Sequence, residues 1–366
     1  MDKIYTAIGL MSGTSLDGID ASIIRSDGEK LIEIKKNLYF PYDEKFKKKL
    51  AEFIDLNEST ENINKNQEQY RDLEQELTIK HAEIVNNVIE KKYEIDLIGF
   101  HGQTITHKPE LKYSIQMGNA NLLSQLSNRK ILFNFRKKDI ENGGEGAPLS
   151  PIYHFNLSNI LNLPDSCIFL NIGGISNATY IKKNTLKAKD VGPGNVLMDE
   201  FLKKTKNFNY DKDGILAEKG SVNYDTINQF MDNQFQAFKN QKSLNRSDFD
   251  FSFVRGLEFE SALATLTYLT AKIISENIKL NYDTNSPIIL CGGGRKNKTL
   301  IKFLKELINT EVHMIDKFGI DGDFVESQCF GYLAIRSYLK KNISFPSTTN
   351  VKFPCCGGEL VINYKN

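Results

Sequence analysis

The 366-residue chain contains no tryptophan, only five cysteines and nine prolines, and almost no net charge. Cysteines this few and scattered exclude the disulfide framework of a small secreted domain. A formal net charge of +1 provides no field that would recruit nucleic acid or a membrane surface, so neither is an expected partner. No apolar run approaches the roughly 20 residues that cross a bilayer. The chain enters an apolar strand pattern directly after Met-Asp-Lys without a signal peptide, and we therefore expect a cytoplasmic protein.

What the chain does contain is typical of a folded α/β protein. Hydrophobic residues make up 40% and charged residues 25%, which argues against disorder. A chain of 366 residues is long for one core and comfortable for two domains. Strand patterns at 4–11, 19–25 and 31–40 predict an antiparallel meander. Helical periodicity then dominates 43–92, and strand signals return at 95–100.

A polar turn separates two apolar runs in the segment 8–21, which reads IGLMSGTSLDGIDA. Glycines at this turn let backbone N–H groups approach anionic oxygens without obstruction by a Cβ atom. Asp17 and Asp20 have the carboxylates that could hold Mg²⁺, directly or through water. The segment has neither the ending of a Walker loop nor the spacing of a dinucleotide fingerprint. Taken alone, it would be better interpreted as an ordinary polar hairpin. The residues expected to surround a phosphate group here are Gly13, Thr14, Ser15, Leu16, Asp17, Gly18, Ile19 and Asp20.

Two further glycine turns at strand ends change that interpretation. Gly173-Gly174 separates two strand patterns within 168–181, and Gly292-Gly293-Gly294 follows Ile-Ile-Leu-Cys and precedes Asn297 at the start of a helical pattern. Three such turns predict one nucleotide that is contacted three times. This arrangement resembles the actin-like, sugar-kinase and heat-shock ATPase superfamily. We therefore expect a two-lobed actin-like (ribonuclease H-like) ATPase/sugar-kinase fold, α/β in class, with the active site in the interlobe cleft.

The lobe boundaries follow from the glycine-rich stretch 130–151, which has too many glycines for a helix or a regular strand. We place the crossover between the lobes in this stretch. Lobe I is expected to comprise residues 1–134 and 325–345, with the first phosphate hairpin and the sugar contacts. Lobe II is expected to comprise 135–324, with the second hairpin, the catalytic aspartate and the adenosine site. Residues 346–366 are expected to form a C-terminal tail.

Four motifs in order resemble the anhydro-N-acetylmuramic acid kinases over nearly the whole chain. They are the segment 9–18, His101-Gly102-Gln103-Thr104, Gly192-Pro193-Gly194-Asn195 and the triple glycine at 292–294. The resemblance implies that ATP, water and 1,6-anhydro-N-acetylmuramic acid become ADP and N-acetylmuramic acid 6-phosphate. It implies a role in the recycling of peptidoglycan sugars, with Mg²⁺ as a cofactor. A homodimer is the oligomeric state that the resemblance suggests.

The resemblance also implies individual roles. Asp190 matches the family's catalytic aspartate, the general base for the water that attacks the anomeric carbon; a turn-capping aspartate is the alternative. Arg136 matches an arginine whose planar guanidinium suits the lactyl carboxylate, although an ion pair with Asp139 would explain it equally well. Glu326 matches a substrate-contacting glutamate, and Asp323 to Glu326 also fits a capping box at the start of the last helix. The substrate-binding residues implied are Ser12, His101, Arg136, Gly192, Asn195 and Glu326.

Two departures from the family pattern leave alternatives open. Val191 stands where threonine is usual, and Glu141-Asn142 replaces small residues; both are expected near the sugar. One alternative is a related kinase of a different sugar, in which Asp190 would deprotonate a hydroxyl group. Another is a non-catalytic, ATP-switched binding or filament protein, which would need neither Arg136 nor His101. On its own, His101 would more often be a hydrogen-bonded structural residue at a strand end.

Overall fold

The computed structural model describes residues 3–57, 59–90, 93–233, 235, 244 and 249–363. The chain divides into two compact units, residues 1–162 with 324–366 and residues 163–323. This division differs from the expected boundaries, because the structure places 135–162 and the expected tail in the first unit. The reason is tertiary: helix α6 (Pro151–Ile160) contacts β3 and α13, and strand β12 (Glu359–Val361) pairs with β6.

The first unit is built on a seven-stranded sheet of order β12-β6-β4-β1-β2-β3, with β5 paired to β4. The predicted meander is confirmed: β1, β2 and β3 pair antiparallel. Strands β4 and β6 are then added parallel on the other side of β1. The strands are β1 (Tyr5–Ser12), β2 (Gly18–Ser26), β3 (Ile32–Pro41), β4 (Leu97–Lys108), β5 (Tyr113–Met117), β6 (Lys130–Phe133) and β12.

The second unit repeats this plan in a five-stranded sheet of order β11-β10-β7-β8-β9. Strands β7, β8 and β9 form an antiparallel meander, and β10 and β11 follow parallel to β7. Two sheets with the same order and the same strand directions are the topology of the two-lobed actin-like fold, so the predicted fold class is confirmed. The strands are β7 (Ser166–Ile172), β8 (Ile175–Lys182), β9 (Thr185–Pro193), β10 (Ile288–Cys291) and β11 (Val312–Met314).

Helices cover both sheets. Helix α1 (Glu44–Leu56) begins after Asp43, whose side chain accepts a hydrogen bond from Phe46 N. It buries the predicted face of Phe46, Leu50 and Phe53. The other helices of the first unit are α2 (Thr60–Lys65), α3 (Gln67–Glu90), α4 (Ala120–Ser127), α5 (Lys137–Glu141), α6, α13 (Val325–Tyr338) and α14 (Pro346–Thr349), with the short η1 (Pro109–Leu111). Among the described residues, none of the helices has the length and apolar character needed to span a membrane.

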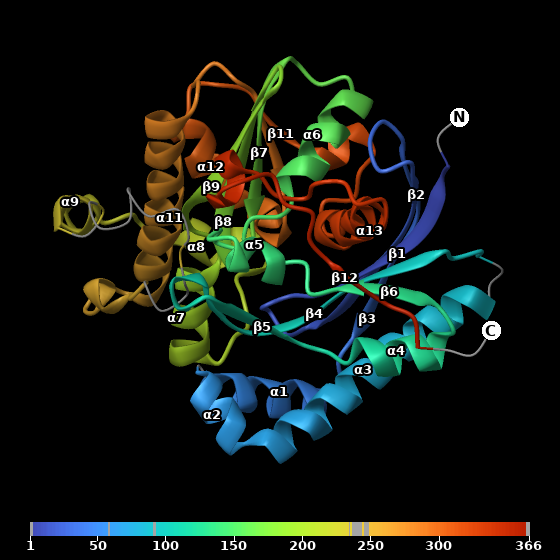
Figure 1. Ribbon diagram of the computed structural model, residues 1–366. Helices are drawn as coiled ribbons and strands as arrows, with labels where there is room; N and C mark the ends of the chain where they lie inside the picture. Colours follow the sequence, from blue (N-terminus) through green and yellow to red (C-terminus); the bar gives the residue numbers. More distant parts are fainter. Residues whose placement is uncertain are drawn as a thin grey trace. The chain divides into compact units, whose positions relative to one another are not determined.

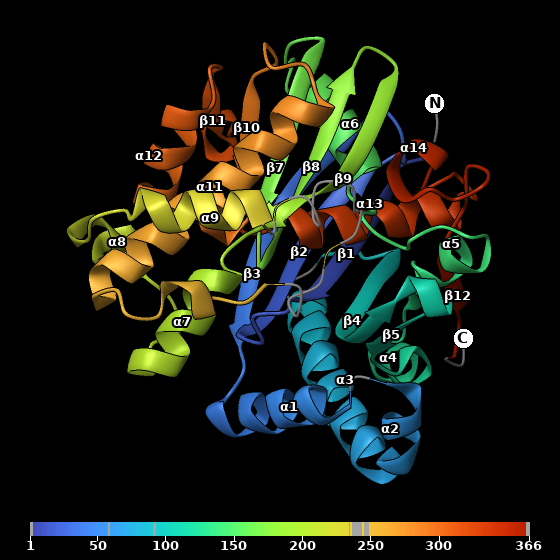
Figure 2. The ribbon, with the colours of Figure 1, turned by 90° about the vertical axis from the view of Figure 1, so that its left-hand side faces the viewer.

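In the second unit, α11 is the long helix that packs on β9, as Figure 2 shows beside the meander. It contributes a run of buried residues to the apolar core of this unit. The helices of the second unit are α7 (Val196–Lys206), α8 (Ile215–Lys219), α9 (Tyr224–Asn233), α11 (Phe259–Asn281) and α12 (Lys298–Leu307), with η2 (Lys212–Gly214), η4 (Ser252–Val254), η5 (Gly293–Lys296) and η6 (Ile315–Phe318).

Helix α13 lies directly against β1, β2 and β4, and it is seen nearly end-on beside β1 and β2 in Figure 1. The approach is this close because the strands present glycine at the contact. A Cβ atom on Gly9 would lie 1.9 Å from Ser327 O and 2.3 Å from Gly331 N, and one on Gly99 would lie 2.2 Å from Phe330 O. The helix that carries Glu326 is therefore held at a fixed position on the first sheet.

We expect Gly9→Ala to destabilise the protein by about 1–3 kcal/mol, because its Cβ meets backbone atoms that move only with the whole helix. The measurement is the free energy of unfolding in urea. Gly293→Ala is the matched control, since a Cβ there meets nothing within 4 Å. Equal unfolding free energies for Gly9→Ala and the wild type would contradict this account of the α13 contact.

Candidate active site

The first phosphate hairpin is the connection between β1 and β2. Leu16 takes a left-handed conformation with φ of 58°, and its N–H donates to Gly13 O at 3.2 Å. A Cβ on Gly13 would meet only Ser15 Oγ, at 3.8 Å, so the backbone here is open to a ligand. Gly18 has a packing role instead, because a Cβ there would lie 2.3 Å from Phe40 O on β3. The open part of the hairpin is thus its first half.

Ser12 is buried at the end of β1, immediately before this hairpin. Its hydroxyl donates to Gln103 Oε1 at 2.6 Å and lies 2.7 Å from the Tyr42 hydroxyl. Burial raises the pKa of Tyr42, so its hydroxyl stays protonated. Tyr42 is not among the residues predicted from the sequence, because no local pattern marks it. Two residues distant in sequence, Tyr42 and Gln103, thus orient the Ser12 hydroxyl.

The two candidate metal ligands have different surroundings. Asp17 is half exposed, with a side-chain exposure of 53%, and its carboxylate accepts from Lys47 Nζ at 2.7 Å. Asp20 lies close enough to Tyr39 and Tyr42 for its charge to contribute to their raised pKa values. In the part of the chain that the structure describes, no group of three or more His, Cys, Asp or Glu is arranged to hold a metal. Two carboxylates still fit Mg²⁺, which commonly takes one or two carboxylates together with substrate phosphates and water.

The structure brings together His101 and Arg136, two of the predicted sugar contacts. Arg136 Nη2 lies 3.0 Å from His101 Nε2, and Arg136 Nη1 donates to Gly146 O at 2.8 Å. Burial, followed by the charge of Arg136, lowers the pKa of His101 to about 3, so the imidazole is neutral. His101 Nδ1 lies 2.8 Å from Gly102 O, which requires the Nδ1–H tautomer and leaves Nε2 to accept from Arg136. His101 therefore orients the guanidinium.

Glu326 is the second residue of α13, and its expected capping box is wrong. The helix is capped by Phe324 without a side-chain hydrogen bond, because the Asp323 carboxylate is bound by Arg295 and Lys296 instead. Glu326 and Arg136 both lie close enough to the buried Cys329 thiol to affect its pKa. Burial is the main cause that raises this pKa; the charge of Glu326 raises it further, and the charge of Arg136 lowers it. Glu326 thus lies in the same region of the first unit as His101 and Arg136.

In the second unit, Asp190 lies near the end of β9, opposite Asn177 on β8. A β-bulge follows, because the register shifts before Gly192 pairs with Ser176. Val191 at the bulge is fully buried in the apolar core of the second unit, so its side chain packs in the core directly beside Asp190 in the chain. The Asp190 carboxylate accepts the backbone N–H of Leu244 at 2.8 Å. At the bulge, Asp190 is thus partly exposed while the next residue, Val191, is buried.

The second phosphate hairpin and the Gly-Pro-Gly-Asn motif form one structure. Gly194 N donates to Gly174 O at 2.8 Å, and Asn195 N donates to Gly173 O at 2.8 Å. A Cβ on Gly194 would lie 2.1 Å from Gly173 O, so only glycine allows this contact. The residues predicted for phosphate and for substrate are therefore held together directly after β7 and β9.

The third glycine turn follows β10, which is parallel to β7 and adjacent to it. Gly292 has φ of 78°, and Gly294 is pressed against Ile172, whose Cγ2 would lie 2.2 Å from an added Cβ. Gly293 faces open space. Asn297 caps α12 by accepting from Leu300 N at 2.9 Å. Because the second and third turns follow the carboxyl ends of neighbouring parallel strands, they lie at the sheet edge where α/β proteins bind ligands.

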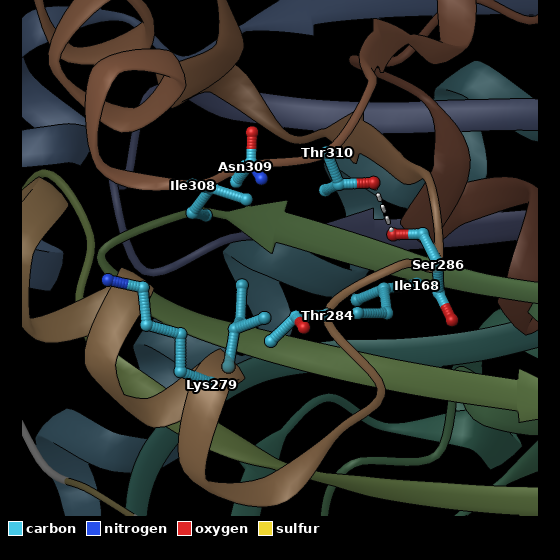
Figure 3. Close-up of a pocket in the computed structure, with 8 residues that line it drawn as sticks. Ile168, Lys279, Thr284, Ser286, Ile308, Asn309 and Thr310 are labelled. Atoms are coloured by element: carbon cyan, nitrogen blue, oxygen red, sulfur yellow. Dashed lines mark hydrogen bonds between the residues drawn. The ribbon is translucent and has the colours of Figure 1, made fainter.

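A cavity of about 220 Å³ lies elsewhere in the second unit (Figure 3). It lies at the amino ends of β7, β10 and β11, the edge opposite the glycine turns, and we exclude it from the candidate active site. Its lining residues are Ile168, Ile278, Lys279, Thr284, Ser286, Ile308, Asn309 and Thr310.

Four histidines with lowered pKa values predict how stability depends on pH. The pKa is lowered to about 4 in His81 and His107 and to about 3 in His101 and His154. In each case the main cause is loss of solvation of the charged imidazole. An unfolded histidine has a pKa near 6.5, so below this pH the unfolded chain binds more protons than the folded one. We expect the free energy of unfolding to fall between pH 7.5 and 5.5, by about 1 kcal/mol per histidine. Urea unfolding at these two pH values tests this, and an unchanged free energy would contradict it.

Comparison with known proteins gives a consistent result along the whole chain. The family described as anhydro-N-acetylmuramic acid kinase matches residues 5–362. Proteins of that name from Pelagibacter ubique and Zymomonas mobilis are 46% and 38% identical, covering 100% and 97% of this chain and 100% and 99% of their own. Among solved structures, component A of (R)-2-hydroxyglutaryl-CoA dehydratase from Acidaminococcus fermentans is similar with a TM-score of 0.46 and 12% identity, covering 92% of this chain and 100% of its own.

Proposed function

The chain belongs to the anhydro-N-acetylmuramic acid kinase family, and from this premise we propose which of its residues carry out the reaction. The protein is a transferase that uses ATP to open 1,6-anhydro-N-acetylmuramic acid hydrolytically and to phosphorylate O6. The products are N-acetylmuramic acid 6-phosphate and ADP, in the recycling of peptidoglycan sugar. The observation that carries this function is the family match across residues 5–362.

Asp190 is the general base of the hydrolytic step. It takes a proton from water as the water oxygen attacks the anomeric carbon, and the bond from that carbon to O6 breaks. Oxygen O6 then forms a bond to the γ-phosphorus, and the bond to the leaving ADP oxygen breaks. The position of Asp190 supports this role, because the residue is partly exposed near the end of β9 and Leu244 N–H orients one carboxylate oxygen.

Arg136 binds the lactyl carboxylate that distinguishes muramic acid from glucosamine. Its two hydrogen-bond acceptors described above, Gly146 O and His101 Nε2, are neutral groups. They orient the guanidinium, whose planar fork of donors suits a carboxylate ligand. Ser12, Gly192, Asn195 and Glu326 are the further sugar contacts in this proposal.

The three glycine turns bind the nucleotide. The hairpin at 13–20 and Gly173-Gly174 contact its phosphates through backbone N–H groups, and Gly292-Gly293-Gly294 with Asn297 supports the adenosine. Asp20 and Asp17 would hold Mg²⁺, directly or through water, and the ion would neutralise charge on the phosphates. The open space at Gly13 and Gly293 supports this assignment, since backbone there is accessible to a ligand.

The test is incubation of the purified protein with Mg·ATP and 1,6-anhydro-N-acetylmuramic acid in ¹⁸O-labelled water, followed by mass spectrometry of the sugar. We expect one ¹⁸O at the anomeric oxygen together with a new 6-phosphate. Incubation without ATP is the control and should leave the anhydro bond intact. A phosphorylated sugar without the label would exclude the coupled reaction.

We also propose a cellular location and an oligomeric state for the protein. We place the reaction in the cytoplasm, because it consumes ATP. We also propose a homodimer as the active assembly, on the resemblance alone.

A further inference from the structure

A buried arginine, Arg295, donates a hydrogen bond to the backbone of the third glycine turn, residues 292–294. Its side chain is only 4% exposed. Nε donates to Asp316 Oδ2 at 2.7 Å and Nη2 to Asp316 Oδ1 at 2.8 Å, which is a bidentate fork. Nη1 donates to Asp323 Oδ1 at 2.5 Å and to the carbonyl oxygen of Gly292 at 3.1 Å. A single guanidinium thus connects the turn to two carboxylates of the segment 316–323.

The backbone of Gly292 is bound at both its polar groups. Its carbonyl accepts from Arg295, and its N–H donates to Gly322 O at 3.1 Å. Gly322 is shaped to the arginine, because a Cβ there would lie 2.4 Å from Arg295 Nε. Asp321 is more distant, with Oδ1 at 3.5 Å from Nη2. Three short hydrogen bonds to two carboxylates hold Arg295, and two backbone contacts then determine where Gly292 lies.

The other side of the turn is packed against the end of β7. An added Cβ on Gly292 would lie 2.3 Å from Asn171 Oδ1, and one on Gly294 would lie 2.2 Å from Ile172 Cγ2. Between these two fixed residues, Gly293 has open space around its Cβ position. Arg295 on one side and β7 on the other thus hold the turn with Gly293 presented to a ligand.

This ion-pair network is better explained by positioning than by stability. A buried arginine with its carboxylates loses solvation, and such a network is often no more stabilising than apolar residues of the same volume. The bidentate contact fixes the orientation of the guanidinium, because a planar group bound to both oxygens of one carboxylate cannot rotate. The pKa of Asp316 is lowered mainly by its hydrogen bond from Arg295, which keeps the partner charged.

We propose that Arg295 is a positioning residue of the nucleotide site: it fixes Gly292 and thereby sets where the backbone of Gly293 meets the nucleotide. The inference rests on the proposed function, in which this turn supports the adenosine. It assigns to Arg295 no contact with the sugar or with the reacting atoms. Its signature is therefore a change in nucleotide affinity without a change in sugar affinity.

The test is Arg295→Lys, which keeps the positive charge and removes the fork. We expect the KM for ATP and the Kd for ADP, measured by calorimetry without turnover, to rise about tenfold, in line with the loss of charge-assisted hydrogen bonds. The KM for the sugar should stay within about twofold of the wild type on the same physical ground, that no bond to the sugar is lost. Asp321→Asn is the matched control at the distant carboxylate and should leave both KM values unchanged. Unchanged ADP affinity in Arg295→Lys would overturn the inference.

A second variant separates this inference from the proposed function. Gly293→Val places a side chain in the open space, where it meets no protein atom within 4 Å from its Cβ, and it should block the nucleotide. If Gly293→Val weakens ADP binding and Arg295→Lys does not, only the role of Arg295 is wrong. If neither variant weakens it, the turn is not a nucleotide site and both proposals fail. Should Arg295→Lys not fold, Asp316→Asn removes the charged acceptor of the fork with little change in volume and is expected to give the same rise.

Discussion

Asp190→Asn is expected to abolish phosphorylation of the anhydro sugar while the protein still binds nucleotide. The asparagine amide cannot take a proton from water, and loss of a general base typically costs about 10²–10⁴-fold in rate. The change is nearly isosteric, and the Asn side-chain oxygen can still accept the Leu244 N–H that Asp190 accepts at 2.8 Å. The variant should therefore keep the geometry of the site but lose the general base.

The measurement is the initial rate of ADP formation with saturating ATP and sugar, together with calorimetric titration of ADP into each protein. Asp225→Asn is the matched control, because it makes the same chemical change at an exposed position of the second unit. It should be as active as the wild type. Full activity of Asp190→Asn would remove Asp190 from the base role, and loss of ADP binding would indicate a structural role instead.

Arg136→Ala is expected to raise the KM for the sugar about tenfold to a hundredfold, the range for losing hydrogen bonds to a charged group. The KM for ATP should not change, because Arg136 hydrogen-bonds His101 and lies in none of the three glycine turns assigned to the nucleotide. Arg136→Lys should recover only part of the affinity, since an ammonium group keeps the charge but lacks the planar fork.

The design that isolates the lactyl contact compares two sugars. The wild type should prefer 1,6-anhydro-N-acetylmuramic acid to 1,6-anhydro-N-acetylglucosamine, which lacks the lactyl carboxylate. Arg136→Ala should lose most of that preference, and the exposed Lys138→Ala should keep it. If Arg136→Ala discriminates between the two sugars as well as the wild type does, Arg136 has a structural role and another group binds the carboxylate.

Features that depend on neighbouring residues could be predicted from the sequence alone. Alternating apolar residues predicted the meander of β1 to β3, and the helical spacing of Phe46, Leu50 and Phe53 predicted the buried face of α1. Glycines between strand patterns predicted the three turns, because a turn with a positive φ or a close backbone contact selects for glycine locally. The four motifs in order were enough to identify the family.

Contacts between residues far apart in the chain could not be predicted in this way. Arg136 and His101 are 35 positions apart, and their hydrogen bond depends on how β4 and the segment after β6 pack. Asp323 was expected to cap α13, but the buried charge of Arg295 takes its carboxylate, since an unpaired guanidinium inside the protein would cost far more than a missing cap. At the bulge in β9, the Val191 side chain is buried in the core. Within the expected tail, residues 359–361 form strand β12 because they pair with β6. Each outcome depends on competition between contacts far apart in the chain, which no local pattern contains.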